Sequence, residues 1–212
     1  MNIKRFTFNP FMENTFIVWD EKSLQAAVVD PGMSDEVEED KLNSFIEENS
    51  LVVKYLINTH CHVDHILGCG FVKEKYNPVY YIPEKDLPLY NHAEKQAEMF
   101  GISMNKLPEI DKYLTEDDKI ILGSESFSNL FTPGHTPGEY CLYFNESNFC
   151  ITGDVLFRES IGRTDLYGGD YDTLIESIKT KLFSLPDDII IYPGHGDQST
   201  IGYEKLNNPF LV

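Results

Sequence analysis

The stretch THCHVDH, residues 59–65, places three histidines and one aspartate within six positions. It directly follows residues 52–58, VVKYLIN, which are rich in β-branched and apolar side chains and therefore predict a strand. The sequence thus predicts a loop at a strand end, where a rigid sheet can aim functional side chains outward.

The spacing inside this stretch indicates metal binding at more than one ion. Alternate residues of an extended segment share a face, so His60 and His62 are expected to point the same way, and Asp64 has the same parity. His65 comes next and is expected to point elsewhere. One short loop can then serve two ions instead of crowding four ligands onto one.

Three further candidate ligands also follow predicted strands: His135 in PGHTPG, Asp154 in TGD and His195 in YPGH. Two tetrahedral or five-coordinate zinc ions need roughly seven or eight protein contacts, and seven residues suffice if one carboxylate bridges. We expect the first ion at His60, His62 and His135, the second at Asp64, His65 and His195, and Asp154 between them. Imidazole and carboxylate favour two zinc ions, although iron and manganese accept the same set.

Strands and helices are predicted to alternate, with a β-rich block in each half of the chain. Ser34 is expected to cap a helix whose apolar stripe includes Val37, and Asp170 is a candidate cap for a helix over Tyr171–Phe183. The other predicted helices are Ile66–Tyr76 and Glu84–Phe100. The predicted strands are Ile3–Phe8, Thr15–Trp19, Gln25–Val29, Val52–Asn58, Val79–Ile82, Lys119–Leu122, Phe127–Phe131, Tyr140–Phe144, Phe149–Thr152 and Ile189–Tyr192.

Composition limits the class of protein. A chain of 212 residues with 42% hydrophobic side chains favours one domain over residues 1–212. It has no apolar run of about 18 residues and no signal-peptide pattern, so we expect a cytoplasmic protein without a membrane partner. A net charge of −18 argues against nucleic acid as a partner. The four cysteines show no metal-binding or disulfide spacing and are expected to be reduced.

The motifs HCHVDH, PGHTPG, TGD and YPGH, in this order, resemble the metallo-β-lactamase superfamily. More narrowly, GRTDLYGGD at 162–170 and the ending NNPFL resemble compact, single-domain glyoxalase II-like hydrolases. The resemblance implies an α/β fold, the four-layer αββα sandwich, and hydrolysis by a metal-bridging hydroxide. Zinc can generate such a nucleophile because it lowers the pKa of bound water from 15.7 to about 7.

The implied substrate is a small-molecule thioester such as S-lactoylglutathione. Its thiolate leaving group is weakly basic, so Asp64 and metal-bound water are the only proton-handling groups that the reaction requires. Two-domain glyoxalase II enzymes bind glutathione partly through a C-terminal helical extension, whereas residues 196–212 alone follow His195 here. Another acyl thiol is therefore an open alternative, and the oligomeric state is open as well.

Other members of the superfamily provide alternatives of a different class. Persulfide dioxygenases share the fold and bind one iron at residues matching His60, His135 and Asp154. Zinc β-lactamases typically carry cysteine or another residue where Asp154 stands, flavodiiron proteins have glutamate where His62 stands, and the nuclease branch would need a basic groove. A non-catalytic binding module is disfavoured because all seven candidate ligands are present.

Several other residues invite a functional interpretation. Asp30 in VVDPG matches a superfamily position near the metals, and it could support a ligand histidine or cap a turn. Arg163 and Asp165 could shape the site or form a structural ion pair. Cys61 is expected to pack in the interior, and His92 is expected to be an ordinary surface or core histidine that binds no metal. The polar segment 84–111 either covers the site or forms a plain surface helix.

Overall fold

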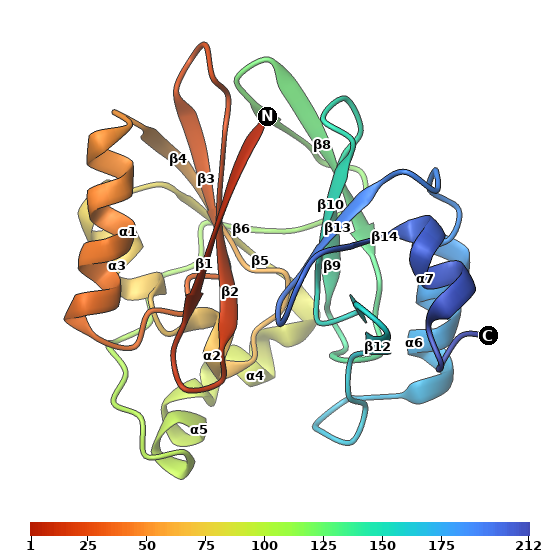
Figure 1. Ribbon diagram of the computed structural model, residues 1–212. Helices are drawn as coiled ribbons and strands as arrows, with labels where there is room; N and C mark the ends of the chain where they lie inside the picture. The colour runs from red at the N-terminus through yellow and green to blue at the C-terminus, as the bar shows by residue number, and fades with distance from the viewer.

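The computed structural model describes residues 1–212 and contains two six-stranded sheets packed face to face (Figure 1). The first sheet, in spatial order, consists of β1 Asn2–Phe8, β2 Glu13–Trp19, β3 Gln25–Val29, β4 Val52–Ile57, β5 Val79–Ile82 and β6 Lys112–Tyr113. The second consists of β14 Ser199–Thr200, β13 Ile190–Pro193, β10 Phe149–Gly153, β9 Tyr140–Phe144, β8 Glu125–Phe131 and β7 Lys119–Leu122. A hairpin of β11 Leu156–Phe157 and β12 Ser160–Ile161 stands apart.

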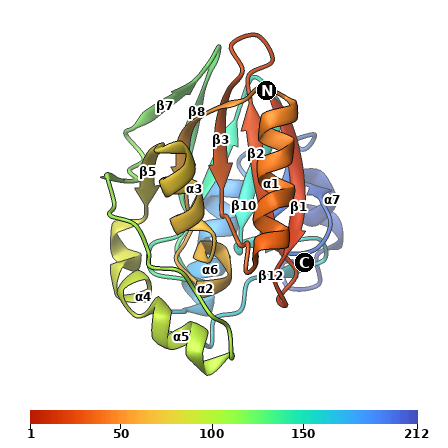
Figure 2. The same ribbon diagram turned by 90° about the vertical axis from the view of Figure 1, so that its left-hand side faces the viewer.

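Helices cover the outer face of each sheet. On the first sheet these are α1 Glu36–Glu48 and α3 Cys69–Tyr76, which lie in front of the strands in Figure 2. On the second sheet they are α6 Tyr171–Ser177, the π-helical turn η2 Ile178–Leu182 and α7 Ile201–Asn207. The helices α2 Val63–Ile66, α4 Leu87–Asn91 and α5 Ala93–Met99, with the 3-10 turn η1 Glu84–Asp86, lie toward the end of the sandwich drawn lowest in Figure 1.

Strand alternation produces these layers. In β2, Ile17 packs on the helices outside the first sheet, whereas its neighbours Phe16 and Val18 pack between the sheets. In β10, Cys150 faces α6 and η2, whereas Ile151 faces the first sheet. Because successive side chains of a strand point to opposite faces, strands that are apolar at every position suit a sheet buried on both sides. The expected αββα sandwich is confirmed.

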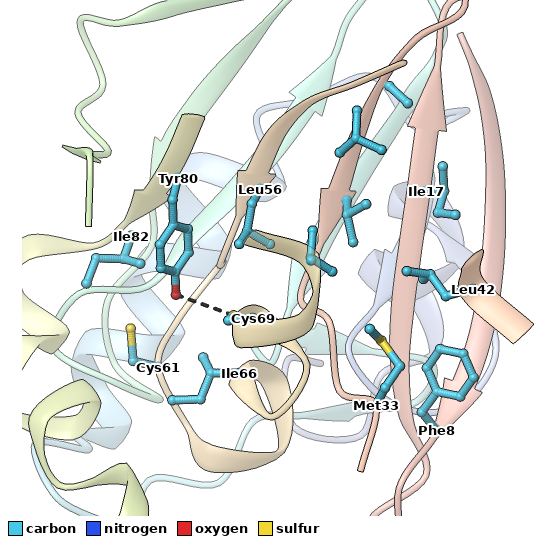
Figure 3. Close-up of a cluster of buried hydrophobic side chains, with 14 of the residues drawn as sticks. Phe8, Ile17, Met33, Leu42, Leu56, Cys61, Ile66, Cys69, Tyr80 and Ile82 are labelled. Atoms are coloured by element: carbon cyan, nitrogen blue, oxygen red, sulfur yellow. Dashed lines mark hydrogen bonds between the residues drawn. The ribbon is translucent and has the colours of Figure 1, made fainter. Parts of the chain in front are cut away.

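The core outside the first sheet lies directly beneath the THCHVDH stretch (Figure 3). Cys61 and Ile66 contribute side chains to it, together with Tyr80 of β5. The Tyr80 hydroxyl donates to the side-chain oxygen of Asn58 over 2.7 Å and lies 3.4 Å from Cys69 Sγ. The stretch is thus anchored on packed apolar side chains, and Cys61 is buried as expected.

Most predicted strands are confirmed, with shifts of one or two residues at their ends. Two helix predictions are wrong in detail. The cap of α1 is Asp35, whose Oδ1 accepts from the Glu38 N–H over 2.9 Å, while Ser34 donates to the Glu38 carboxylate instead. Val37 is 63% exposed and does not belong to the buried stripe.

The polar segment after β5 is also broken up. The structure has three short pieces over 84–99 instead of one long helix, and His92 lies at the last junction. The cap at Asp170 is confirmed, because Asp170 accepts from the Thr173 N–H over 2.8 Å. No helix is long and apolar enough to cross a membrane.

Candidate metal centre

Four strands that belong to parallel pairs end at the same edge of the sandwich. In the first sheet β3 pairs with β4, and in the second β10 pairs with β13. The chain leaves these strands toward Asp30, His60, Asp154 and His195, in that order. Since the carboxyl ends of parallel strands meet at one edge, candidate ligands that are far apart in sequence are brought together there.

The THCHVDH stretch is only partly a loop. Residues 58–62 leave β4 in an extended path, but Val63–Ile66 form the single helical turn α2, which begins after His62. The prediction that Asp64 follows the parity of His60 and His62 is therefore wrong, because the chain is helical at Asp64. The turn instead places Asp64 and His65 on a second group of ligands.

The first group consists of His60, His62 and His135, whose nitrogen atoms lie within 4.8 Å of one another. His62 Nδ1 and His135 Nε2 are only 2.8 Å apart. All three side chains are buried. Three imidazoles converging on one point form a typical set of zinc ligands.

The second group consists of Asp64, His65 and His195, again within 4.8 Å. Asp64 Oδ2 lies 3.3 Å from His195 Nε2 and 3.7 Å from His65 Nε2. A set of two imidazoles and one carboxylate suits zinc, iron and manganese alike.

Asp154 lies between the two groups. Its Oδ2 is 3.5 Å from His135 Nε2 and 3.6 Å from His195 Nε2, and its Oδ1 is 3.5 Å from His65 Nε2. One carboxylate thus faces histidines of both groups. The partition of the ligands between two ions, with Asp154 bridging, stays a prediction with which these distances are compatible.

The far ring nitrogen of four histidines faces an oxygen atom. The pairs are His60 Nδ1 with Glu139 Oε1 at 3.4 Å, His65 Nδ1 with Asp30 Oδ2 at 3.3 Å, His135 Nδ1 with the Arg163 carbonyl at 2.7 Å, and His195 Nδ1 with the Phe11 carbonyl at 3.1 Å. The Nδ1 atoms of His135 and His195 donate to these carbonyl oxygens, which leaves the lone pair of each ring on Nε2. The carboxylates of Glu139 and Asp30 lie at ion-pair distance from His60 and His65.

Buried polar atoms without partners show that this set fits metal ions. Nε2 of His60 and of His65 and Oδ1 of Asp154 are buried and have no hydrogen-bond partner within the protein. Buried polar groups are rarely left unpaired, because an unpaired group loses its hydration without compensation. Two cations at this position would satisfy these atoms, so the residues fit the metal ions that the fold implies.

The charge states of the two groups differ. Burial, together with the other histidines, lowers the pKa of His60 well below its usual value, and burial lowers the pKa of His62 to about 3. These rings are neutral and have lone pairs to donate. For His65 burial opposes charging, but Asp154 and Asp64 outweigh it and raise its pKa well above the usual value. The second group therefore attracts positive charge.

Asp30 supports the ligand loop from β3. Its Oδ1 accepts from the Thr59 N–H over 2.7 Å, and its Oδ2 accepts from the Thr59 hydroxyl over 2.6 Å. The same Oδ2 faces His65 Nδ1. Of the two roles considered from the sequence, the structure places Asp30 beside a candidate ligand.

Asp86, which the sequence did not single out, joins the two ligand loops of the first group. Its carboxylate accepts from the Cys61 N–H over 3.1 Å, the Thr136 hydroxyl over 2.9 Å and the Gly138 N–H over 2.7 Å. Burial raises its pKa to about 6, although these three hydrogen bonds act in the opposite direction. Asp86 thus fixes the loop of His60 and His62 against the loop of His135.

Gly194 allows a close approach of chains in the site. A Cβ atom at this position would lie 2.3 Å from Asp154 Oδ1 and 2.7 Å from Cε1 of His65. Its N–H donates to the Gly153 carbonyl over 2.7 Å. No side chain fits, so glycine is required for His195 to reach the site.

A cavity of about 380 Å³ opens onto the candidate ligands. Its polar floor includes His62, Asp64, His135, Asp154 and His195. Its walls are Phe11, Val63, Gln96, Phe100, Phe157, Ile161, Arg163 and Leu166. A largely apolar pocket with converging polar groups at one end is the usual form of a small-molecule site.

Of the remaining candidates from the sequence, one lies outside this site and the others line its cavity. His92 is exposed, and its Nδ1 pairs with the Pro88 carbonyl over 2.8 Å, away from the ligands. Arg163 forms a two-pronged ion pair with Asp165, at 2.7 and 2.8 Å, and also lines the cavity. From segment 84–111, Gln96 and Phe100 reach the cavity wall, so this segment covers part of the site.

Several wall and support residues were missed. Phe11 and Leu166 lie in a turn and a bend, and Phe157 lies in the two-residue strand β11, and their sequence gives no sign of a pocket. Glu139 and Asp86 are buried acids, but in a chain with 35 acidic residues nothing in the sequence separates them from surface acids. The signal that could have helped is position: Glu139 directly follows the PGHTPG motif.

Two histidine-rich groups with a carboxylate between them, buried at one edge of two sheets, form clusters suited to binding divalent metal ions, as in metallohydrolases. The model of the metallo-β-lactamase superfamily matches residues 8–195, and the chain belongs to this superfamily. It is 41% identical to hydroxyacylglutathione hydrolase GloC from Haemophilus influenzae, over 100% of this chain and 98% of that protein.

Solved structures agree with this assignment. The chain is similar to the crystal structure of BLEG-1 B3 metallo-beta-lactamase, with a TM-score of 0.88, 30% identity and coverage of 100% of both chains. TTHA1623 in a di-iron-bound form gives a TM-score of 0.87 and 36% identity, over 98% of this chain and 100% of that one. ETHE1 from Myxococcus xanthus gives 0.80 and 26%, over 99% and 84%. Together the family and its relatives support a metal-dependent hydrolase.

Proposed function

We propose that the protein hydrolyses a small-molecule thioester at a centre of two zinc ions held by His60, His62, Asp64, His65, His135, Asp154 and His195. The observation that carries this proposal is the position of Asp154, whose two oxygens face histidines of both triads. A single ion would leave one triad and half of this carboxylate unused.

The ions, when bound, supply Lewis-acid activation of water and of the substrate carbonyl. The protein contributes Asp64, which lies on the cavity floor. Burial disfavours its charged form, but His65 and His195 outweigh this effect and hold the pKa of Asp64 well below its ordinary value. Asp64 is therefore a carboxylate at neutral pH, and it can bind an ion and orient a water molecule by accepting a hydrogen bond from it.

The cavity walls suit a thioester. Phe11 and Phe100 meet edge to face, with ring centroids 5.0 Å apart, and form an apolar wall over the floor. A carbon chain and a sulfur atom lose little hydration against such rings. Because a thiolate is a weakly basic leaving group, no additional proton donor is needed on this wall.

Relatives support the substrate class and leave the metal to be measured. The similar protein GloC is named a hydroxyacylglutathione hydrolase, which favours an acyl glutathione or another acyl thiol as substrate. The similar structure of TTHA1623 is titled a di-iron-bound form, so iron must be measured alongside zinc. The all-imidazole first triad, in a buried site, is the observation that favours zinc.

The test combines metal analysis with a substrate panel. Protein purified without added metal is expected to contain two ions per chain and to hydrolyse S-lactoylglutathione or another acyl thioester, and a β-lactam serves as the comparison substrate. His62→Ala should lose one ion and reduce kcat at least 100-fold. His92→Ala is the matched control, since His92 is exposed and lies away from the ligands. Thioester inactivity of the metal-loaded protein would refute the proposal.

A second candidate is oxygenation of a persulfide at one iron. His60, His135 and Asp154, the residues expected for that chemistry, also converge, and ETHE1 is among the similar structures. It predicts one iron per chain, oxygen consumption with glutathione persulfide and little effect of His195→Ala on metal content. Two ions per chain without oxygen consumption would exclude it.

A further inference from the structure

The carboxyl group of Glu139 is fully buried just before β9, beside the candidate ligands His60 and Asp154. It is not one of the seven candidate ligands, and it lies four positions after His135 in the chain. Its Oε1 accepts from the backbone N–H of Asp154 over 2.7 Å. The same oxygen lies 3.4 Å from His60 Nδ1. One oxygen atom therefore contacts a ligand of the first triad and the shared aspartate.

Thr59 and Glu139 both lie beside His60 Nδ1. Thr59 Oγ1 lies 3.1 Å from Nδ1 and already donates its only hydrogen to Asp30, so it accepts the hydrogen of the ring. Glu139 Oε1 contacts the same ring atom at 3.4 Å without a hydrogen bond. Thr59 therefore orients the ring and Glu139 limits its position, while Nε2 has no hydrogen-bond partner within the protein.

The backbone at Gly153 makes the second contact possible. A Cβ atom there would lie 2.7 Å from Glu139 Oε1 and 2.6 Å from Thr59 Oγ1. Gly153 also has φ of +48°, a conformation that glycine adopts readily. The end of β10 can therefore pass between the two side chains and present the N–H of Asp154 to Glu139.

Glu139 also connects the two sheets. His60 follows β4 of the first sheet, whereas Asp154 follows β10 of the second. We propose that Glu139 is a positioning residue of the metal centre, which holds His60 and Asp154 in register across the two sheets so that both ions can bind. The inference rests on the proposed metal-dependent function, but not on the identity of the substrate.

The test measures metal binding directly by competition with a chromophoric chelator. Glu139→Ala removes the shared acceptor and should raise the dissociation constant for zinc about 10- to 100-fold. Glu139→Gln keeps an uncharged oxygen at the same place and should fall between Glu139→Ala and the wild type. In cobalt-loaded protein, Glu139→Ala should also shift the visible absorption bands that report ligand geometry.

Glu125→Ala is the matched control. Glu125 is also a buried glutamate of the second sheet, and it accepts from the N–H groups of Glu146 and Ser147 over 2.9 and 3.2 Å. It should lower thermal stability without changing zinc affinity or the cobalt spectrum. Wild-type zinc affinity in Glu139→Ala, or an equal loss in Glu125→Ala, would overturn the proposal. If Glu139→Ala does not fold, wild-type affinity in Glu139→Gln would overturn it.

These outcomes separate the positioning role from the proposed activity. Zinc affinity and the cobalt spectrum can be measured whether or not any thioester is hydrolysed. If the wild type hydrolyses no thioester but Glu139→Ala binds zinc more weakly as expected, the thioesterase proposal is refuted. The positioning role of Glu139 is then still supported.

Discussion

At the scale of single residues, the metal centre depends on atoms that have no room to move. Gly194 shows this most directly, because a methyl group there would overlap Asp154 and His65. Ligand positions within a metal site tolerate only small displacements before affinity falls. The precision of the site is thus partly a property of residues that touch no ion.

Gly194→Ala is expected to lose at least one ion and most activity. The new Cβ would lie only 2.3 Å from Asp154 Oδ1 and would push this oxygen away from the ion. Metal content by mass spectrometry of the native protein checks this. Gly196→Ala is the control: its Cβ would meet nothing within 4 Å. In that variant alanine must adopt a left-handed backbone conformation, with φ of +75°, which lowers the free energy of unfolding by about 1 kcal/mol. The variant should keep both ions.

Asp86 gives a prediction for the pH dependence of stability. Its folded pKa of about 6 exceeds the ordinary value of 3.8, so the folded state binds the proton more tightly. The contribution of Asp86 to the free energy of unfolding is fully present below pH 4 and is lost as the pH rises to 6. The free energy of unfolding should fall by about 3 kcal/mol over this range. The check is urea unfolding of metal-free protein at pH 4 and at pH 7, compared with Asp86→Asn.

The sign of this difference decides the outcome. The wild type should lose stability relative to Asp86→Asn as the pH rises, because the asparagine cannot ionise. A stability difference that stays constant across this range would show that the three hydrogen bonds to Asp86 outweigh its burial.

At the scale of elements, α7 supports the cavity although none of its residues lines it. Glu204 of α7 is buried and accepts from the Glu159 N–H over 2.9 Å. Asn208 donates to the Ser160 carbonyl over 3.0 Å. These bonds hold the β11–β12 hairpin, which presents Phe157 and Ile161 to the cavity.

Glu204→Ala should therefore raise KM several-fold while both ions remain bound, since it loosens a wall and not a ligand. The loss of buried hydrogen bonds should also lower the free energy of unfolding by about 1–3 kcal/mol. Steady-state kinetics with parallel metal analysis is the measurement. Lys205→Ala on the same helix removes contacts with Asp187, Leu185 and Phe183, none of which lines the cavity, and should leave KM unchanged. A loss of metal in Glu204→Ala would contradict the prediction that Glu204 supports the cavity wall and not the metal ligands.

The wall formed by α5 and the β1–β2 turn gives a second prediction at this scale. Phe100→Ala removes the ring that packs on Phe11 at the cavity wall, and it should raise KM for an acyl thioester about 10-fold. Metal content should not change. Met99→Ala is the matched control, because Met99 is 83% exposed and does not line the cavity. Equal kinetics in the two variants would remove Phe100 from the substrate site.

The sequence predicted strands better than helices for a physical reason. Strands such as Val79–Ile82 and Tyr140–Phe144 are buried on both faces, so their apolar runs are continuous and end where burial ends. The helical turn at Val63–Ile66 is only four residues long, too short to show a 3.6-residue period, and packing imposes it. The helix break at His92 was hidden because polar surface residues carry no periodic signal.

The candidate ligands were predictable because their residue types and order are unusual, whereas their supports were not. Burial, not residue type, distinguishes Glu139 and Asp86 from other acids, and burial depends on the packing of both sheets. The cavity walls come from turns that meet only in the folded chain.

At the scale of the whole molecule, the ions are expected to fasten the two sheets to each other. His60, His62, Asp64 and His65 follow β4 of the first sheet, whereas His135, Asp154 and His195 belong to loops at the second. Ligands that bind only the folded state stabilise it by mass action, by about 4.1 kcal/mol at a free concentration 1,000 times the dissociation constant.

Removing the ions with a chelator should therefore lower the melting temperature clearly, and adding zinc should restore it. Calorimetry of metal-free and zinc-loaded protein is the measurement. In His62→Ala the shift should be smaller, because one triad is incomplete. A melting temperature that does not respond to zinc would argue against ions shared between the sheets.

The division of the ligands between the sheets also has a consequence for synthesis of the chain. The four candidate ligands of residues 60–65 leave the ribosome together, well before His135, Asp154 and His195 have been made. During that interval the nascent chain displays two of the three proposed ligands of each triad, so neither triad is complete. If the proposed ligands bind the ions, a full set exists only after the second sheet has been synthesised and has docked on the first.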